Sequence, residues 1–226
     1  MCIKKLKSQQ LKVLYQQISF YFTEKSSRIP GEKMENLDQI KVEKQTHPEL
    51  SILSPFDLSV EYSQFPAEKF LGDSHYALQF CIVLHGSAEV LFEKFSREFN
   101  EGELWWNMCW EPHAYRLSGR RNFILAVNID VEQLGSCSPF SGCNWLTPFI
   151  AHPENRYCPA NDKERNFIVN AGKELYHLYQ HQNNNWRISS WLLIHQILLY
   201  AINRMNWSEL EDTMGRDSAN SFPRIR

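Results

Sequence analysis

The stretch from His75 to His113 constrains the fold of this 226-residue chain more than any other part. It reads HYALQFCIVLHGSAEVLFEKFSREFNEGELWWNMCWEPH, in which short β-type runs are separated by turns at His85-Gly86 and Asn100-Glu101-Gly102. Short strand-like runs with glycine turns at close spacing are typical of a β-sandwich or barrel. The stretch therefore predicts the middle of a small β-barrel with one histidine near each end.

Breaker residues and shifts in composition divide the rest of the chain. The apolar spacing after residue 160 follows the helical repeat, and Asn161 or Asp162 is suited to begin the first helix. The fold class is therefore mainly β with C-terminal α. The expected parts are a partly disordered N-terminal extension (1–49), the barrel (50–134), an irregular connector (135–160), two helices (161–207) and a flexible tail (208–226).

The basic segment over residues 1–33 has two interpretations. Met34 follows the breaker Ile29-Pro30-Gly31, so the segment is either an added amphipathic helix or an over-extended reading frame. The whole chain carries a formal net charge of only −2, which gives no general argument for nucleic acid or acidic substrates. No apolar run reaches the roughly 18 residues needed to span a bilayer, so we expect no membrane partner and a cytoplasmic location.

The tryptophan-rich run from Leu104 to Glu111 presents two candidate linings for a barrel cavity. Indole rings supply large stacking surfaces together with an N–H donor. The alternation of a strand separates two faces, and the sequence alone does not assign inside and outside. One face holds Leu104, Trp106, Met108 and Trp110, and the other holds Trp105, Asn107, Cys109 and Glu111.

Three short motifs match the glycine, proline and histidine rhythm of cupin domains: Gly86, then Gly102-Glu103-Leu104, then Pro112-His113. Over residues 50–226, the order of barrel, connector, two helices and a closing Phe222-Pro223-Arg224-Ile225-Arg226 resembles the N-terminal domain of AraC-type transcription regulators. The resemblance implies a cupin-like double-stranded β-barrel of jelly-roll type, followed by two antiparallel helices. In that family a helix-turn-helix region follows such a junction, so DNA contact is expected only through a domain absent from this chain.

The resemblance also implies a ligand-sensing and dimerisation domain without catalytic activity or cofactor. The expected partners are a small-molecule effector in the barrel and a second copy of the chain, forming a homodimer. The effector-binding candidates are His75, Tyr76, Trp106, Trp110, His113, Tyr115 and Arg116. The dimer-interface candidates are Trp191, Leu192, His195, Leu198, Leu199 and Ile202.

A small cupin metalloenzyme is the alternative function. Cupin enzymes hold a divalent metal with an HxH pair, a nearby carboxylate and a later histidine, so His75 and His113 match two of the four ligands. The second histidine position holds Ala77, and the carboxylate region reads Gln79-Phe80-Cys81. We therefore expect no metal, unless Glu93 or Glu89 completes a site with the two histidines.

Three of the histidines also fit purely structural roles. His75 could be a surface turn residue, and His113 a hydrogen-bonded residue at a strand start. His195 could be a core residue on the apolar face of its helix. If none of them binds a ligand, the chain would be a stand-alone dimerising modulator that binds no effector, which is the third functional hypothesis.

Overall fold

The structure, a computed structural model, describes residues 37, 40–45, 50, 54–136 and 145–205. The chain divides into the units Met1–Met34 and Glu35–Arg226, and only the second contains described residues. The predictions for residues 1–33, for the tail from residue 208 and for part of the connector therefore lie outside the described residues.

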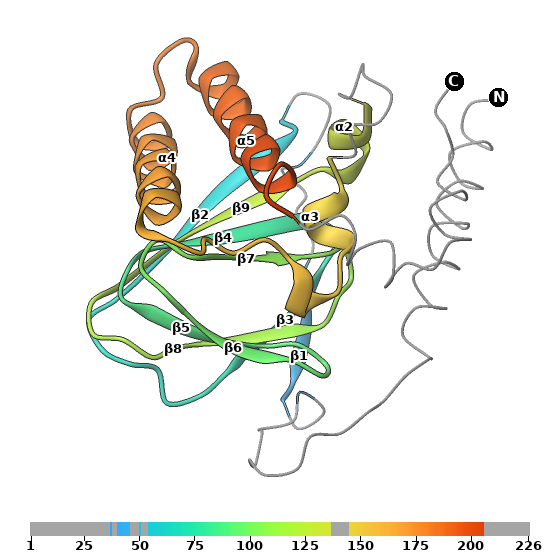
Figure 1. Ribbon diagram of the computed structural model, residues 1–226, viewed down its shortest axis with the longest axis vertical. Helices are drawn as coiled ribbons and strands as arrows, with labels where there is room; N and C mark the ends of the chain where they lie inside the picture. Colours follow the sequence, from blue (N-terminus) through green and yellow to red (C-terminus); the bar gives the residue numbers. More distant parts are fainter. Residues whose placement is uncertain (1–36, 38–39, 46–49, 51–53, 137–144, 206–226) are drawn as a thin grey trace, which may run out of the picture. The chain divides into compact units, whose positions relative to one another are not determined.

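Two β-sheets face each other in the described part of the chain (Figure 1). The first sheet has the strand order β1-β3-β8-β5-β6, and the second has the order β2-β9-β4-β7. Neighbouring strands are antiparallel, except for the parallel pair β1 and β3. The jelly-roll prediction is confirmed, although the two sheets do not close into one continuous barrel. The strands are β1 Val42–Gln45, β2 Phe56–Ser63, β3 Leu71–His75, β4 Leu78–His85, β5 Ser87–Leu91, β6 Ser96–Asn100, β7 Leu104–Asn107, β8 His113–Leu117 and β9 Asn122–Ile129.

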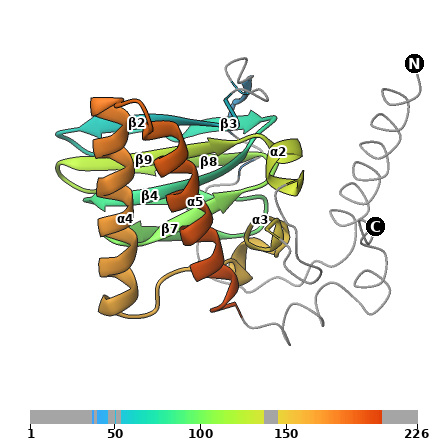
Figure 2. The ribbon, with the colours of Figure 1, turned by 90° about the horizontal axis from the view of Figure 1, so that it is seen from above.

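Two long helices cover the outer face of the four-stranded sheet (Figures 1 and 2). They are α4 Asp162–His181 and α5 Trp186–Ile202, and the predicted cap is confirmed because Asn161 accepts a hydrogen bond from the backbone N–H of Glu164. Shorter helical segments, α2 Val131–Ser136, α3 Thr147–Ile150 and η2 Pro153–Asn155, precede them. No helix in the described part of the chain is long and apolar enough to span a membrane.

Strand β4 is buried on both faces, which explains why its sequence is continuously apolar rather than alternating. Phe80 and Ile82 belong to the cluster packed against the helices. Cys81 and Val83 belong to a second cluster between the two sheets, which we call the interior. The strand therefore has the interior on one face and the helices on the other.

The faces of β7 are assigned by the same two clusters. Trp106 packs with the helix-side cluster, whereas Trp105 packs in the interior. The face that begins with Trp105 and Asn107 is thus the interior lining, and the face that begins with Leu104 and Trp106 is not. Of the second predicted face, Trp105 and Asn107 therefore line the interior, whereas Cys109 packs with the helix-side cluster.

Two boundaries differ from the prediction. Strand β1 lies within residues 1–49, which were predicted to be an N-terminal extension. It is a short polar strand at the edge of its sheet, so its sequence lacks the apolar alternation that indicates a strand. Strand β7 ends at Asn107, and Trp110 adopts a φ of 59° in the turn that follows. The strand predicted to continue through Glu111 is therefore too long, because a left-handed residue breaks the ladder.

Candidate functional site

Two histidines and one carboxylate meet in the interior. His75 ends β3, His113 begins β8, and Asp73 pairs with His113 across the two strands. The imidazole rings are 5.2 Å apart and nearly perpendicular. One ligand-type atom from each of the three residues lies within 4.8 Å of the others. Both histidines are buried, so the interpretation of His75 as a surface turn residue is wrong.

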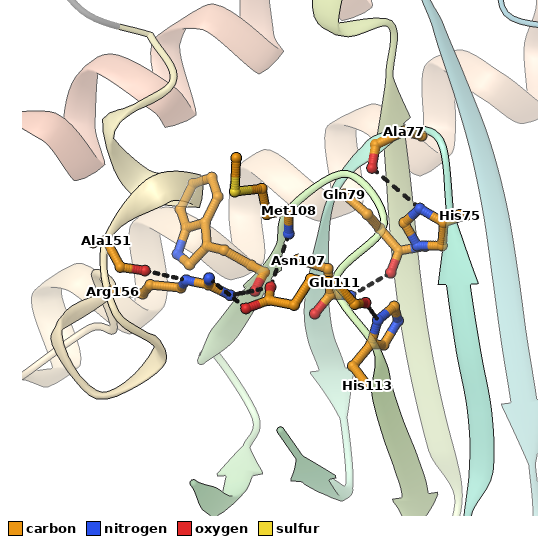
Figure 3. A network of polar contacts seen from close by, with 10 residues as sticks. His75, Ala77, Gln79, Asn107, Met108, Glu111, His113, Ala151 and Arg156 are labelled. Carbon is orange, nitrogen blue, oxygen red and sulfur yellow. Dashed lines mark hydrogen bonds and ion pairs between the residues drawn. The ribbon is translucent and has the colours of Figure 1, made fainter. Parts of the chain in front are cut away.

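Backbone carbonyl groups set the orientation and tautomer of both rings (Figure 3). Nδ1 of His75 lies 3.1 Å from the carbonyl oxygen of Ala77, and Nδ1 of His113 lies 2.9 Å from that of Glu111. A carbonyl oxygen only accepts hydrogen bonds, so Nδ1 is the protonated nitrogen in each neutral ring. Nε2 is then the ring atom able to accept a hydrogen bond or bind a metal. The prediction of a hydrogen-bonded His113 at a strand start is confirmed.

The environment keeps His113 neutral. Burial, followed by the nearby His75, lowers the pKa of His113 to about 3. The hydrogen bond to the Glu111 carbonyl acts in the opposite direction and the positive charge of Arg156 acts in the same one. At neutral pH the ring is therefore an acceptor rather than a cation.

A ladder of amide side chains crosses the interior face of the four-stranded sheet beside the histidines. Asn107 donates to Gln79 at 2.6 Å, and Gln79 donates to Asn128 at 2.8 Å. All three residues are buried. Within the described part of the chain, Oδ1 of Asn107 and Nε1 of Trp105 are buried without a hydrogen-bond partner. An unmet buried polar group costs about 1–3 kcal/mol, so these two atoms mark a place suited to a polar ligand or water.

Tyr115 extends this polar region toward β2. It lies on the interior face of β8 and hydrogen-bonds the carboxylate of Glu61. Burial and the negative charge of Glu61 raise the pKa of Tyr115, so the hydroxyl stays protonated and can donate. The interior thus combines imidazoles, amides, a phenol and carboxylates.

A small cavity lies where β6 and β7 meet the connector. A cavity of about 10 Å³ is lined by residues of β6, β7 and the connector, among them Phe99, Trp105 and Arg156. That volume accommodates about one water molecule. His75, His113 and Asp73 do not line this cavity.

The seven effector-binding candidates separate into three groups. His75, His113 and Tyr115 lie in the interior, as described above. Tyr76 and Trp110 lie beside them: their rings are 5.8 Å apart, and the backbone N–H of Trp110 donates to the carbonyl of His75 at 2.8 Å.

The other two candidates do not reach the interior. Trp106 is wholly buried on the helix side, where its indole N–H donates to the Tyr157 carbonyl at 2.8 Å and its ring packs against Phe149. Arg116 points to the outer face of the five-stranded sheet, where it pairs with Glu89 and lies over the Phe70 ring. Both corrections follow from the alternation of strand side chains.

The carboxylate beside the histidines is also different from the expected one. Glu93 is exposed in the turn between β5 and β6, and Glu89 pairs with Arg116. Asp73, whose sequence context is typical of a turn, takes this place instead. Polar residues within otherwise apolar strands, such as Gln79 and Asn128, were the available sequence signal for the rest of the site.

The dimer-interface candidates divide by exposure. Leu198 and Ile202 are buried, at 0% and 6% exposure, so they pack within this chain and cannot form a free surface. Leu192 and Leu199 are exposed, and Ile188 extends their stripe by one helical turn. Trp191 and His195 are partly buried: Trp191 stacks on Phe56, and Nδ1 of His195 lies 2.8 Å from the Trp191 carbonyl.

A buried ion pair links the histidine region to the connector (Figure 3). The Arg156 guanidinium holds both carboxylate oxygens of Glu111, at 2.7 and 2.8 Å, and each side chain is only 6% exposed. Arg156 also donates to the carbonyls of Ala151 and Trp106. Glu111 in turn accepts from the backbone N–H of Met108. We call this arrangement the Arg156–Glu111 clamp.

Comparison with known proteins finds no family model and no curated protein that matches the chain. Solved structures with local similarity include an HTH_3 family transcriptional regulator from Vibrio cholerae, with 16% identity over 37% of this chain and 47% of that one and a TM-score of 0.31. The DMSP lyase DddQ from Ruegeria pomeroyi has 26% identity over 35% and 41%, also with a TM-score of 0.31. The cupin_2 domain of an XRE family regulator from Enterobacter cloacae has 17% identity over 37% and 88%, with a TM-score of 0.32.

The matched region spans less than half of the first two of these proteins. TM-scores of 0.31 and 0.32 establish neither a family nor a function for the chain.

Proposed function

We propose that this chain is the ligand-sensing and dimerisation domain of an AraC-like transcription regulator, and that a small polar effector binds in the interior beside His75 and His113. The observation that carries the proposal is the meeting of two imidazoles and a carboxylate of the five-stranded sheet in the interior, opposite the four-stranded sheet whose outer face carries the helices. A core built only for stability would favour apolar residues at these positions.

The position of the site favours sensing. Strand β4 contributes Gln79 to the interior and Phe80 to the helix-side packing, so a change on one face reaches the other within a single residue. An effector shifts the arrangement only if it binds one packing of helices and sheet more tightly than another.

Dimerisation is proposed to use the outer stripe of α5. Ile188 and Leu192 are 64% and 65% exposed, and burying such side chains against a second copy removes apolar surface from water. The assignment to AraC-type regulators rests on the order of elements alone. DNA contact would then require a further domain, and the protein would be cytoplasmic and non-catalytic.

Thermal unfolding with defined probes tests this proposal. The probes are glucose, benzoate and inorganic phosphate, which represent the sugar, aromatic and anionic effector classes. We expect one class to raise the midpoint in a saturable way, and His113→Asn to abolish the rise. The matched control is His85→Asn, because His85 is exposed at the end of β4. Equal shifts in both variants would place binding elsewhere and contradict the proposal.

A divalent-metal site is the second candidate, and the donor set favours it. Two imidazoles and one carboxylate form a recognised ligand combination for metals such as Fe(II), and the Nδ1–H bonds to carbonyls orient the rings as in metal-binding histidines. Asp73, His75 and His113 would hold the ion, which would supply Lewis-acid chemistry. This set differs from the one predicted for the metalloenzyme alternative in its carboxylate, which is Asp73 rather than Glu93 or Glu89.

Metal analysis of untagged protein separates the two candidates. The metal candidate predicts about one equivalent of divalent ion after dialysis against Zn²⁺ or Mn²⁺, retained in His85→Asn and lost in His113→Asn. Less than a tenth of an equivalent in the unmodified chain would remove this candidate and leave the effector proposal intact.

A further inference from the structure

The Arg156–Glu111 clamp joins two parts of the molecule that the proposed function requires to communicate. On the interior side, Glu111 lies two residues before His113, and its carbonyl receives the His113 Nδ1–H. On the other side, Arg156 belongs to the connector that leads into the helices. Figure 3 shows the guanidinium and the imidazole on opposite sides of the Glu111 backbone.

The connector residue next to Arg156 contacts both helices. The Tyr157 ring packs against Tyr200 of α5, with ring centres 6.2 Å apart. Its hydroxyl donates to Glu164 in the first turn of α4 at 3.3 Å. Its carbonyl accepts the indole N–H of Trp106 from β7. Two consecutive connector residues, Arg156 and Tyr157, thus link the clamp to the four-stranded sheet and to both helices.

The geometry of the clamp requires arginine. The guanidinium uses a fork of donors on both Glu111 oxygens and reaches two backbone carbonyls as well, whereas a lysine ammonium is a compact point charge that cannot span them. The same carboxylate accepts the Met108 N–H, which fixes the turn between β7 and β8. The direction of the Glu111 carbonyl, and hence of the His113 ring, depends on that turn.

We propose that Arg156 is a positioning residue: it holds the His113 ring in the Nδ1–H form through Glu111 and couples the interior site to α4 and α5 through Tyr157. This proposal rests on the function proposed above, and it specifies how that site is regulated. Loss of the clamp changes the tautomer of His113 without touching the ring, and it uncouples the helices from the site.

The test compares Arg156→Lys with Arg97→Lys in the full chain. Arg97 is the control because it also pairs with a buried carboxylate, that of Glu103 at 3.5 Å, in an ion pair separate from the clamp. Histidine-selective ¹⁵N NMR reports the tautomer directly. We expect the unmodified chain and Arg97→Lys to show His113 protonated at Nδ1, and Arg156→Lys to show averaged Nδ1 and Nε2 signals.

Amide hydrogen exchange over residues 147–157 and 186–202 tests the coupling. In the unmodified background, His113→Asn should accelerate exchange in both segments several-fold. In the Arg156→Lys background the same substitution should add no further acceleration, whereas in Arg97→Lys it should act as in the unmodified chain. Unchanged His113 signals in Arg156→Lys, or equal acceleration in all three backgrounds, would overturn the proposal.

Tyr157→Phe keeps the test decisive if Arg156→Lys does not fold. It removes the hydroxyl bond to Glu164 and retains the ring. We expect it to preserve the His113 tautomer and to reduce the helix response to His113→Asn; a full response overturns the coupling. Neither readout uses an effector, so failure of every thermal-shift probe would count against the proposed function alone.

Discussion

Gly102 lies directly against Arg165, and this contact fixes how α4 meets the sheets. A Cβ atom at Gly102 would come within 2.6 Å of the Arg165 Cβ and 3.1 Å of its Cα. Gly102 also has a φ of +84°, a backbone conformation that side chains disfavour. The turn between β6 and β7 is therefore a glycine because a helix backbone approaches it closely.

The substitution Gly102→Ala should destabilise the fold by about 2 kcal/mol, because it combines a strained φ with a backbone clash. Urea unfolding measures the change. Ser59→Ala provides the comparison, since Ser59 is an exposed position on the edge strand β2 and should change stability by less than about 0.5 kcal/mol. Equal midpoints for the two variants would show that α4 can move away from the turn.

The Arg156–Glu111 clamp should be much more costly to break than an exposed ion pair. Arg156→Met leaves the Glu111 carboxylate buried without its partner, for which we expect a loss of about 3–5 kcal/mol. Arg116→Met breaks the pair with Glu89, whose side chains are about one-third exposed, and should cost about 1 kcal/mol or less. Chemical denaturation of both variants measures the two losses, and similar values would contradict the buried character of the clamp.

Stability should depend on pH through His113. Its pKa is about 3 in the folded chain against 6.5 for an unperturbed histidine, so the unfolded chain binds the proton first as the pH falls. The stability associated with the neutral ring is complete above pH 6.5 and is lost progressively between pH 6.5 and about 3.

The urea midpoint of the unmodified chain should therefore fall between pH 7 and pH 4.5, and His113→Asn should show a smaller fall. His85→Asn serves as the reference, since that exposed residue lies outside the interior. Parallel curves for the unmodified chain and His113→Asn would mean that the pKa of His113 is the same in the folded and unfolded chain.

Dimerisation through α5 predicts that Leu192→Glu yields monomers without loss of stability, because Leu192 is 65% exposed in the single chain. Light scattering during size-exclusion chromatography gives the mass. Gln180→Glu, at an exposed polar position on α4 rather than on the proposed interface of α5, is the charge control and should remain dimeric. A monomeric unmodified chain would exclude this interface.

The sequence was sufficient to predict the helices and strands but not which faces of the strands point into the interior. Apolar patterns and glycine turns correctly indicated the strands from Leu78 onward and both long helices, since these are local signals. The sequence did not show which face of β7 points into the interior. One face of its sheet packs against the helices and the other against the second sheet, so apolar residues occupy both.

The candidate site shows the same division. His75 and His113 stand out in the sequence as chemical types, but their meeting depends on pairing between the distant strands β3 and β8, in which Asp73 lies opposite His113. Asp73 was overlooked because Gly-Asp-Ser is a common turn sequence. The clamp partner Arg156 had no local signal, since its role depends on the path of the connector.

Histidine-selective ¹⁵N NMR during titration with glucose, benzoate, phosphate and Zn²⁺ shows directly whether a ligand binds beside His75 and His113. We expect at least one probe to shift the Nε2 signals of both residues saturably, with Nδ1 remaining protonated. The exposed His85 and His177 should not follow the same curve. If every probe left the two interior rings unchanged, or moved only the exposed histidines, the interior would not be the binding site.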